Sequence, residues 1–147
     1  MAGKKVGLSC KLFNNTGTFA VPVWAEITIA RDVTLNMEAG EAEASSRANT
    51  FREYLQALKD AGIEFDMLFD GADVQFGLIK DAYFDNTTLD LLALDGASAT
   101  SGNSGLRMVC VVTGFTRNEP LEEAVTVAVT VKPTPNADSP PVWFTVP

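Results

Sequence analysis

The sequence of 147 residues contains no histidine and only two cysteines, Cys10 and Cys110. Without histidine, the chain cannot form a Ser-His-Asp or Cys-His catalytic arrangement or the common zinc sites. Both cysteines lie among apolar residues in strand-like segments, so we expect two buried free thiols. A disulfide would need their Cα atoms within about 7 Å, which the sequence does not show.

Basic residues are also few. The chain carries 11 lysines and arginines against 19 acidic residues, which gives a net charge of −8, and its only basic cluster is Lys4-Lys5. A protein that grips DNA without sequence preference carries clustered lysine and arginine. If this protein meets DNA, we expect it to do so without holding it.

Long hydrophobic runs are absent as well. No apolar stretch approaches the roughly 20 residues that a membrane-spanning helix needs. The residues before Asn14 also lack the apolar segment of a signal peptide. We therefore expect no membrane insertion by this chain. Its length, with 46% apolar and 20% charged residues, fits one globular domain covering residues 1–147.

Alternating apolar residues predict several strands. The first is expected at residues 5–12, with one buried face made of Val6, Leu8, Cys10 and Leu12. A turn follows at residues 14–17, and a bulge or bend is expected at Arg31-Asp32. Further strands are expected at residues 24–29, 33–37, 106–115, 125–131 and 142–146, and an extended segment at residues 133–141.

The centre of the chain combines both periodicities. In residues 63–69 apolar residues alternate with mostly acidic ones, as in a half-buried strand. A helix follows, with Asp70 as its N-cap and Asp73 three residues further on, a pair that resembles a capping box. The apolar side chains of this helix form two adjoining stripes, Val74-Leu78-Ala82 and Phe76-Ile79-Tyr83. Residues 87–93 then alternate as another strand.

A helix with an apolar stripe must pack on a sheet. We therefore predict a mainly β fold: a β-barrel or sandwich of two packed antiparallel sheets, with one flanking α-helix at about residues 71–84 and a long loop at about residues 38–50. Loops longer than about 12 residues in a compact domain are usually functional or disordered. Residues 51–58 are ambiguous between helix and strand, because their apolar positions have helical spacing.

The candidate catalytic carboxylates have positions that a strand face or a helix cap already explains. Glu64, Asp66 and Asp70 share the solvent face of a strand, and Asp70 and Asp73 cap a helix. The spacing of a calcium loop is absent. We therefore expect neither an enzyme nor a cofactor or metal site. Scattered aromatic residues leave open a β-sandwich module that binds carbohydrate or protein; these residues are Trp24, Tyr54, Phe84 and Trp143.

Two stretches carry a family resemblance. The run RANTFREYLQALKDAGIEFDM, followed by an acidic turn, a short helix and TTLDLLALDG, resembles the middle of phage tail tube (major tail) proteins. RNEPLEEAVTVAVTVKPT resembles the end of the same proteins. The resemblance covers most of the chain. It implies a β-rich structural subunit that stacks as six-membered rings around a DNA channel. It also implies that residues 51–58 are extended and form a hairpin with residues 63–69 through residues 59–62.

The resemblance further implies a place in the tail of a virion, with synthesis in the host cytoplasm. Its partners would be further copies of the chain in a helical stack of hexameric rings, a tape measure protein, tail tip and terminator proteins, and DNA in transit. The tube of a type VI secretion system or of a gene transfer agent is an alternative in the same class.

Three sets of residues are candidates for assembly. The long loop would dock on neighbouring rings through Glu38, Glu41, Glu43 and Arg47. Carboxylates on the polar strand faces would line the lumen, with Glu64, Asp66 and Asp90 as candidates. Residues 106–115 are apolar on both faces, which is typical of a central strand or a subunit contact. The subunit interface would then include Val109, Val111 and Phe115, opposite the face that carries Leu106, Met108, Cys110 and Val112.

Overall fold

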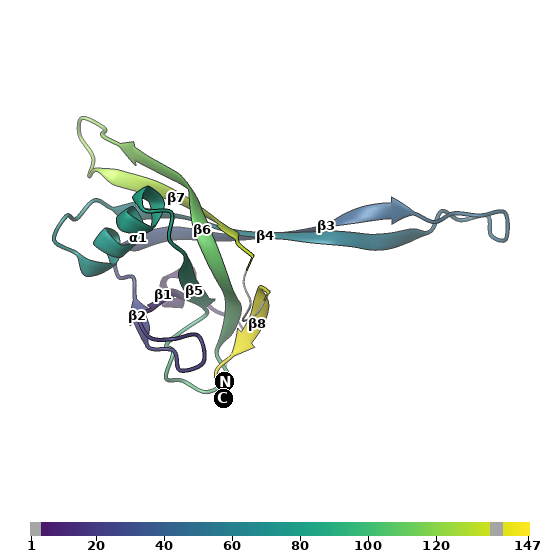
Figure 1. Ribbon diagram of the computed structural model, residues 1–147, viewed down its shortest axis with the longest axis horizontal. Helices are drawn as coiled ribbons and strands as arrows, with labels where there is room; N and C mark the ends of the chain where they lie inside the picture. Colours follow the sequence, from purple (N-terminus) through teal and green to yellow (C-terminus); the bar gives the residue numbers. More distant parts are fainter. Residues whose placement is uncertain (1–3, 136–139) are drawn as a thin grey trace.

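One antiparallel sheet of eight strands makes up most of the protein (Figure 1). The structure is a computed structural model and describes residues 4–135 and 140–147. The strands run in the order β2-β1-β5-β6-β7-β4-β3, and β8 pairs with β6. Their bounds are β1 Lys11–Asn15, β2 Trp24–Glu26, β3 Ala30–Glu43, β4 Tyr54–Leu68, β5 Leu89–Leu94, β6 Ser104–Asn118, β7 Thr126–Pro133 and β8 Val142–Thr145.

The predicted mainly β class with a single α-helix is confirmed. The two expected layers belong to one sheet that curves until its end strands, β2 and β3, come close together. Only residues 27–29 separate these strands in the chain. Ile27 N donates to Leu12 O at 2.8 Å, and Ile29 O accepts from Leu68 N at 3.0 Å. This short segment therefore joins β1 to β4 and partly closes a barrel.

The main core lies on the inner face of this curve, which we call the core face. Side chains from β4, β5, β6 and β7 meet there; those less than 2% exposed include Ile63, Met67, Leu91, Met108, Cys110, Val127, Val129 and Val131. The alternation predicted for residues 63–69 and 125–131 is therefore confirmed, apart from the exposed Phe69. A smaller cluster on the opposite face contains Phe13, Leu92, Leu94 and Val146.

The helix α1, Val74–Phe84, covers part of the core face (Figure 1). Its N-cap is Asp73, whose carboxylate accepts from the backbone N–H groups of Gln75 and Phe76 at 2.9 and 3.1 Å. The prediction of Asp70 as the cap is wrong, because the chain leaves β4 through a turn in which Asp70 accepts from Ala72 N. The helix consequently begins about one turn later than predicted.

Of the two predicted stripes of α1, one is the main contact with the core. Phe76 and Ile79 are buried, together with Ala82, whereas Val74 is 72% exposed. A stripe pattern alone does not tell which side of the helix meets the sheet. Burial of Phe76 is reinforced by the Phe115 ring on β6, whose centroid lies at 6.2 Å.

The N-terminal segment differs from its prediction. A 3-10 turn at Gly7–Ser9 precedes β1, which starts only at Lys11. Leu8 is 93% exposed, and Cys10 is exposed while Cys110 is buried. The expectations of a strand over residues 5–12 and of two buried thiols are therefore wrong for this segment. Asn14, predicted to lie in a turn, is buried in β1 and donates to Gln75 Oε1 on α1 at 3.1 Å.

A long two-stranded arm replaces the predicted loop. Strands β3 and β4 pair from Ala30-Met67 to Glu43-Tyr54 and project far beyond the rest of the molecule (Figure 1). Only residues 44–53 form the connecting loop, and the turn predicted at residues 59–62 lies inside β4. The arm is exposed on both faces, so its sequence carries no apolar alternation, and backbone pairing alone maintains its strands.

Three bulges or irregularities interrupt the strand pairing, and one of them lies in the arm, between Ala39 and Glu41. The predicted bulge at Arg31-Asp32 is confirmed, since Ala30 pairs with Met67 and Val33 with Phe65. A second bulge lies on β6 between Val112 and Gly114. The expected C-terminal strand is confirmed as β8. Of the extended segment expected at 133–141, residues 136–139 lie outside the described residues.

We expect Ile79→Ala to lower the free energy of unfolding by about 2–5 kcal/mol, because Ile79 is fully buried between α1 and the sheet. Leu78→Ala is the matched control; this side chain is 37% exposed and its loss should cost distinctly less. Urea unfolding followed by circular dichroism measures both. Equal losses for the two variants would contradict the packing of α1 described above.

Candidate assembly surfaces

Among residues 4–135 and 140–147, no group of histidine, cysteine, aspartate or glutamate side chains could hold a metal ion. Within the same residues, no helix is long and apolar enough to cross a membrane. Burial raises the pKa of the Cys110 thiol to about 12, and nearby Asp90 adds to this effect. This thiol is therefore not a nucleophile near neutral pH.

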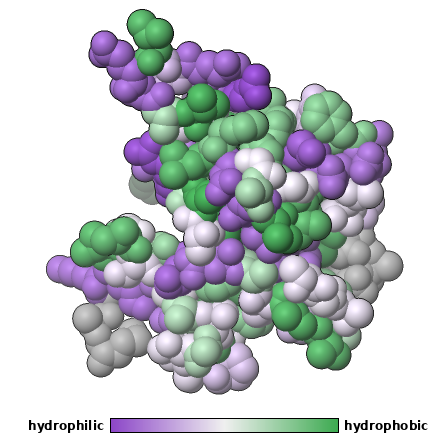
Figure 2. Space-filling view, turned by 90° about the vertical axis from the view of Figure 1, so that its left-hand side faces the viewer, coloured by the Kyte–Doolittle hydropathy of each residue, from purple (hydrophilic) through white to green (hydrophobic). Residues whose placement is uncertain are grey.

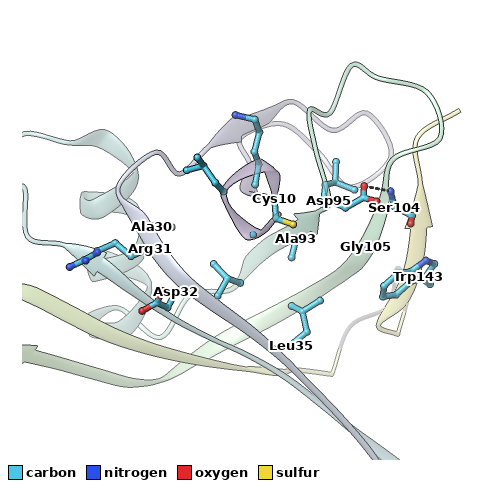
Figure 3. A pocket seen from close by; sticks show the side chains of 15 residues that line it. Cys10, Ala30, Arg31, Asp32, Leu35, Ala93, Asp95, Ser104, Gly105 and Trp143 are labelled. Carbon is cyan, nitrogen blue, oxygen red and sulfur yellow. Dashed lines mark hydrogen bonds between the residues drawn. The ribbon is translucent and has the colours of Figure 1, made fainter. Parts of the chain in front are cut away.

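A cavity of about 830 Å³ opens between β1 and β3 (Figure 3). Its walls come mainly from the turn at Gly7–Ser9, β3, β5 and Trp143 of β8. Asp95 accepts from Ser104 N at 2.9 Å, and this hydrogen bond lowers the pKa of its carboxyl group. Arg31 points away from Asp95 and Cys10 (Figure 3). The cavity thus lacks converging catalytic groups and is the gap left where the barrel does not close.

Four neighbouring strand segments form the part of the sheet that leads into the arm. In order they are residues 111–118 of β6, β7, residues 62–68 of β4 and residues 30–36 of β3, and we call them the four-stranded segment. At one border of this segment, no further strand of the described residues pairs with β3. At the other border, β5 pairs with β6 only up to Cys110, so residues 111–118 of β6 have no neighbouring strand on that side in the described part of the chain. Both borders therefore present unpaired backbone groups.

The face of the four-stranded segment away from the core is polar and acidic, and we call it the open face. Glu64 and Asp66 lie on it beside Asp32, and the three carboxylates line a shallow depression of about 310 Å³. The other side chains that line this depression on the open face are small, for example Thr34, Ala128 and Thr130. No ion pair within the described residues involves Glu64 or Asp66, so the charge of this face is not compensated there.

Asp90 differs from the other two candidate wall residues. Its carboxylate is 12% exposed and pairs with Arg107 at 2.7 Å. Asn15 Nδ2 donates to it at 3.0 Å, and Arg107 also donates to Phe19 O and lies over the Phe19 ring at 4.0 Å. Asp90 is therefore a salt-bridged residue, the alternative to a wall position for each of these candidates, and its charge is neutralised in a structural cluster.

This cluster positions the connection between β1 and β2. Arg107 lies 4.9 Å from the Trp24 ring and 4.0 Å from the Phe19 ring, so one guanidinium orders both ends of that connection. Sequence reasoning missed Arg107, because a single arginine in an apolar strand gives no sign of its partner. The partner lies on the adjacent strand, where Asp90 is two residues from Leu92, the residue that pairs with Arg107.

The three candidate interface residues do not share a face. Val109 and Val111 are half-buried and lie opposite Asp90 and Lys132, on the side of the sheet that bears the open face. Phe115 lies on the core face, since the bulge after Val112 shifts the alternation by one residue. Its ring stacks on Tyr83 of α1 at 5.8 Å. The prediction that Phe115 faces the same way as Val109 is therefore wrong.

The four residues assigned to the long loop all lie on the arm. Glu38 faces Asp60 across the hairpin, while Glu41 and Glu43 point to the opposite face because strand residues alternate. Arg47 is in the connecting loop at the tip. Two like charges directly opposite one another are unfavourable, and Lys132 offsets this pair by approaching Asp60 at 3.8 Å.

Solved structures of tail tubes have the same architecture. A chain in the tail of an empty gene transfer agent particle, determined with C6 symmetry, matches with a TM-score of 0.71 and 11% identity, covering 97% of this chain and 98% of that one. A chain of the SPP1 tail tube matches with a TM-score of 0.73 and 12% identity, covering 88% and 75%. This protein has the fold of tail tube proteins.

The same tail tube fold occurs in contractile injection systems. A chain in the extended sheath-tube complex of an extracellular contractile injection system matches with a TM-score of 0.66 and 8% identity, covering 98% of this chain and 93% of that one. No protein-family model and no curated protein matches the sequence. The tail tube fold is thus shared with almost no sequence identity.

We expect Asp90→Ala to lower the free energy of unfolding by about 3–5 kcal/mol, because it leaves the buried Arg107 charge unpaired. Glu26→Ala is the control. It breaks the Lys11–Glu26 pair, whose side chains are 36% and 37% exposed, and should cost about 1 kcal/mol or less. Urea unfolding compares the two. Similar small losses would show that the cluster does not anchor the β1–β2 connection.

Proposed function

We propose that this protein is the structural subunit of a tail tube, in a phage or phage-like particle, and that it has no enzymatic activity. The observation that supports this most directly is the four-stranded segment with an unpaired edge on each side. An open edge is a template for pairing with another chain. Two open edges on one curved sheet allow copies to add in series until a ring closes.

The strand directions fit such a ring. Neighbouring strands are antiparallel throughout β6-β7-β4-β3, so β6 and β3 run in opposite directions. Placing β6 of one copy beside β3 of the next therefore continues the antiparallel order without interruption. The edges available are residues 111–118 of β6 and residues 31–36 of β3. Six copies would close a hexameric ring, as in the C6 tail of the gene transfer agent particle.

The open face then lines the channel of the ring. Glu64 and Asp66 repeat in every copy and every ring, so the wall carries an excess of negative charge, and the one lysine of this face, Lys132, is paired with Asp60. DNA phosphates gain no counterion release on such a wall. At a Debye length of about 8 Å, repulsion acts only on DNA near the wall. DNA would pass through without being bound.

The arm extends the contact from ring to ring. The arm suits docking on a neighbouring copy because it is long, exposed on both faces and charged, with Glu38, Glu41, Glu43 and Arg47.

The protein would be made in the host cytoplasm and act in the virion tail. Its other partners would be a tape measure protein and the tail tip and terminator proteins, with no insertion of this chain into a membrane.

Electron microscopy of the purified protein at high concentration should show rings or tubes. Removing the arm beyond the body, residues 38–60, and joining its ends by a short turn should leave a folded subunit that cannot elongate, because the core residues are all retained. Circular dichroism checks the fold of the deletion variant. Uniform monomers of the full chain under all conditions, including with tail initiator proteins, would contradict the proposed function.

Tubes carrying Glu64→Lys and Asp66→Lys should form normally but retain short duplex DNA at low salt. Lysines on the wall release counterions from DNA, so retention should fall steeply between about 50 and 200 mM salt. Fluorescent DNA that co-sediments with the tubes measures this. Glu26→Lys with Asp81→Lys is the control, because both carboxylates are exposed and lie outside the four-stranded segment. Equal DNA retention by wall and control variants would show that Glu64 and Asp66 do not face the lumen.

A further inference from the structure

The tip of the arm is a basic segment of this acidic chain. Residues 44–52 contain Arg47 and Arg52 but no carboxylate, and Phe51 between them is 76% exposed. Five cations form no ion pair with the described residues. Three of them are on the arm, namely Arg47, Arg52 and Lys59, and the other two are Lys4 and Arg31. The tip therefore offers two free guanidinium groups beside an exposed aromatic ring.

Hydrogen bonds give this tip a defined shape. Ala44 N donates to Glu53 O at 2.8 Å, closing the hairpin. Inside the loop, Glu53 N donates to Ser45 Oγ at 3.0 Å and Phe51 N donates to Asn49 Oδ1 at 3.0 Å. An ordered loop loses less conformational entropy on binding than a flexible one. The tip is thus prepared for contact with another surface.

The opposite end of the molecule has complementary properties (Figure 2). It is formed by α1 and the connection between β6 and β7, and it exposes apolar side chains among acidic ones. Leu121 is 99% exposed and Phe84 is 68% exposed. Asp85, Glu122 and Glu123 form no ion pair with the described residues. We call these five residues and Val74, which is 72% exposed, the end surface.

The two parts of the end surface are linked where the chain enters α1, and nearby cations are already paired. Phe69 N donates to Val125 O at 2.9 Å, and Arg117 lies 5.2 Å from the Phe69 ring, so the residues leading into α1 contact the ends of β6 and β7. Arg117 pairs with Glu119 at 2.9 Å and Lys80 with Asp81 at 3.9 Å. The remaining carboxylates are left for cations from outside the molecule.

We propose that the arm tip of one copy docks on the end surface of a second copy. Arg47 and Arg52 pair with Glu122, Glu123 and Asp85, and Phe51 packs against Leu121 and Phe84. The tip and the end surface lie at opposite ends of the long axis (Figure 1), so the contact is head-to-tail and repeats from copy to copy. This inference rests on the proposed function and names the surface that receives the arm.

A charge swap tests the docking. Arg47→Glu with Arg52→Glu, and separately Glu122→Lys with Glu123→Lys, should each raise the critical concentration for tube formation about tenfold, because exposed ion pairs are replaced by repulsion. A chain with all four substitutions should return to within about twofold of the wild type. The control is Lys4→Glu, a charge reversal at an exposed lysine outside the arm, which should leave the critical concentration unchanged.

Sedimentation measures the critical concentration, and circular dichroism confirms that each variant is folded. Two outcomes overturn the docking alone: wild-type tubes that are insensitive to charge reversal at the tip, or a four-substitution chain as defective as its parents. A wild-type chain that never forms rings or tubes overturns the proposed function itself. Restored assembly in the four-substitution chain supports the docking, since neither parent alone could provide it.

Discussion

The structure depends on two strand edges whose backbone groups have no partner within the subunit. Residues 31–43 of β3 and residues 111–118 of β6 border the same sheet from opposite sides. Exposed edges of this length are a liability in a monomer, and proteins usually shorten, charge or cover them. Here the edges are long and almost without charge on β6, where only Arg117 is basic. In the proposed ring, pairing between copies would satisfy the backbone groups of both edges.

The remaining features follow from this constraint. Because one face of the four-stranded segment holds the core, the proposed ring would turn the other face to the channel. That face carries small and acidic side chains, such as Thr130, Glu64 and Asp66. The β3–β4 hairpin belongs to the same segment, so the arm would be fixed to the wall of the proposed ring. At the other end of the sheet, the Asp90–Arg107 cluster and the second apolar cluster secure β1, β2 and the C-terminal residues.

The sequence predicted the strands and the helix whose apolar side chains recur at a regular spacing and are buried. Residues 63–69 and 125–131 alternate over a full strand, and the helix carries apolar stripes, so these elements could be read directly. It could not predict the arm, because residues 38–60 are exposed on both faces and no pattern distinguishes a hairpin from a loop. It misassigned Phe115, because one bulged residue after Val112 exchanges the faces. It could not identify the partner of Asp90, because the neutralising Arg107 lies 17 residues away in sequence and adjacent only in the sheet.

Hydrogen exchange on isolated subunits and on assembled tubes tests the pairing of edges most directly. Backbone amides of residues 31–36 and 111–118 that point outward should exchange quickly in the subunit and become protected in the tube. Amides of β7, which are bonded on both sides within one subunit, serve as the internal reference and should be protected in both states. If tubes form while the outward amides of β3 and β6 still exchange as fast as in the isolated subunit, the copies are not joined by their sheet edges and this account is wrong.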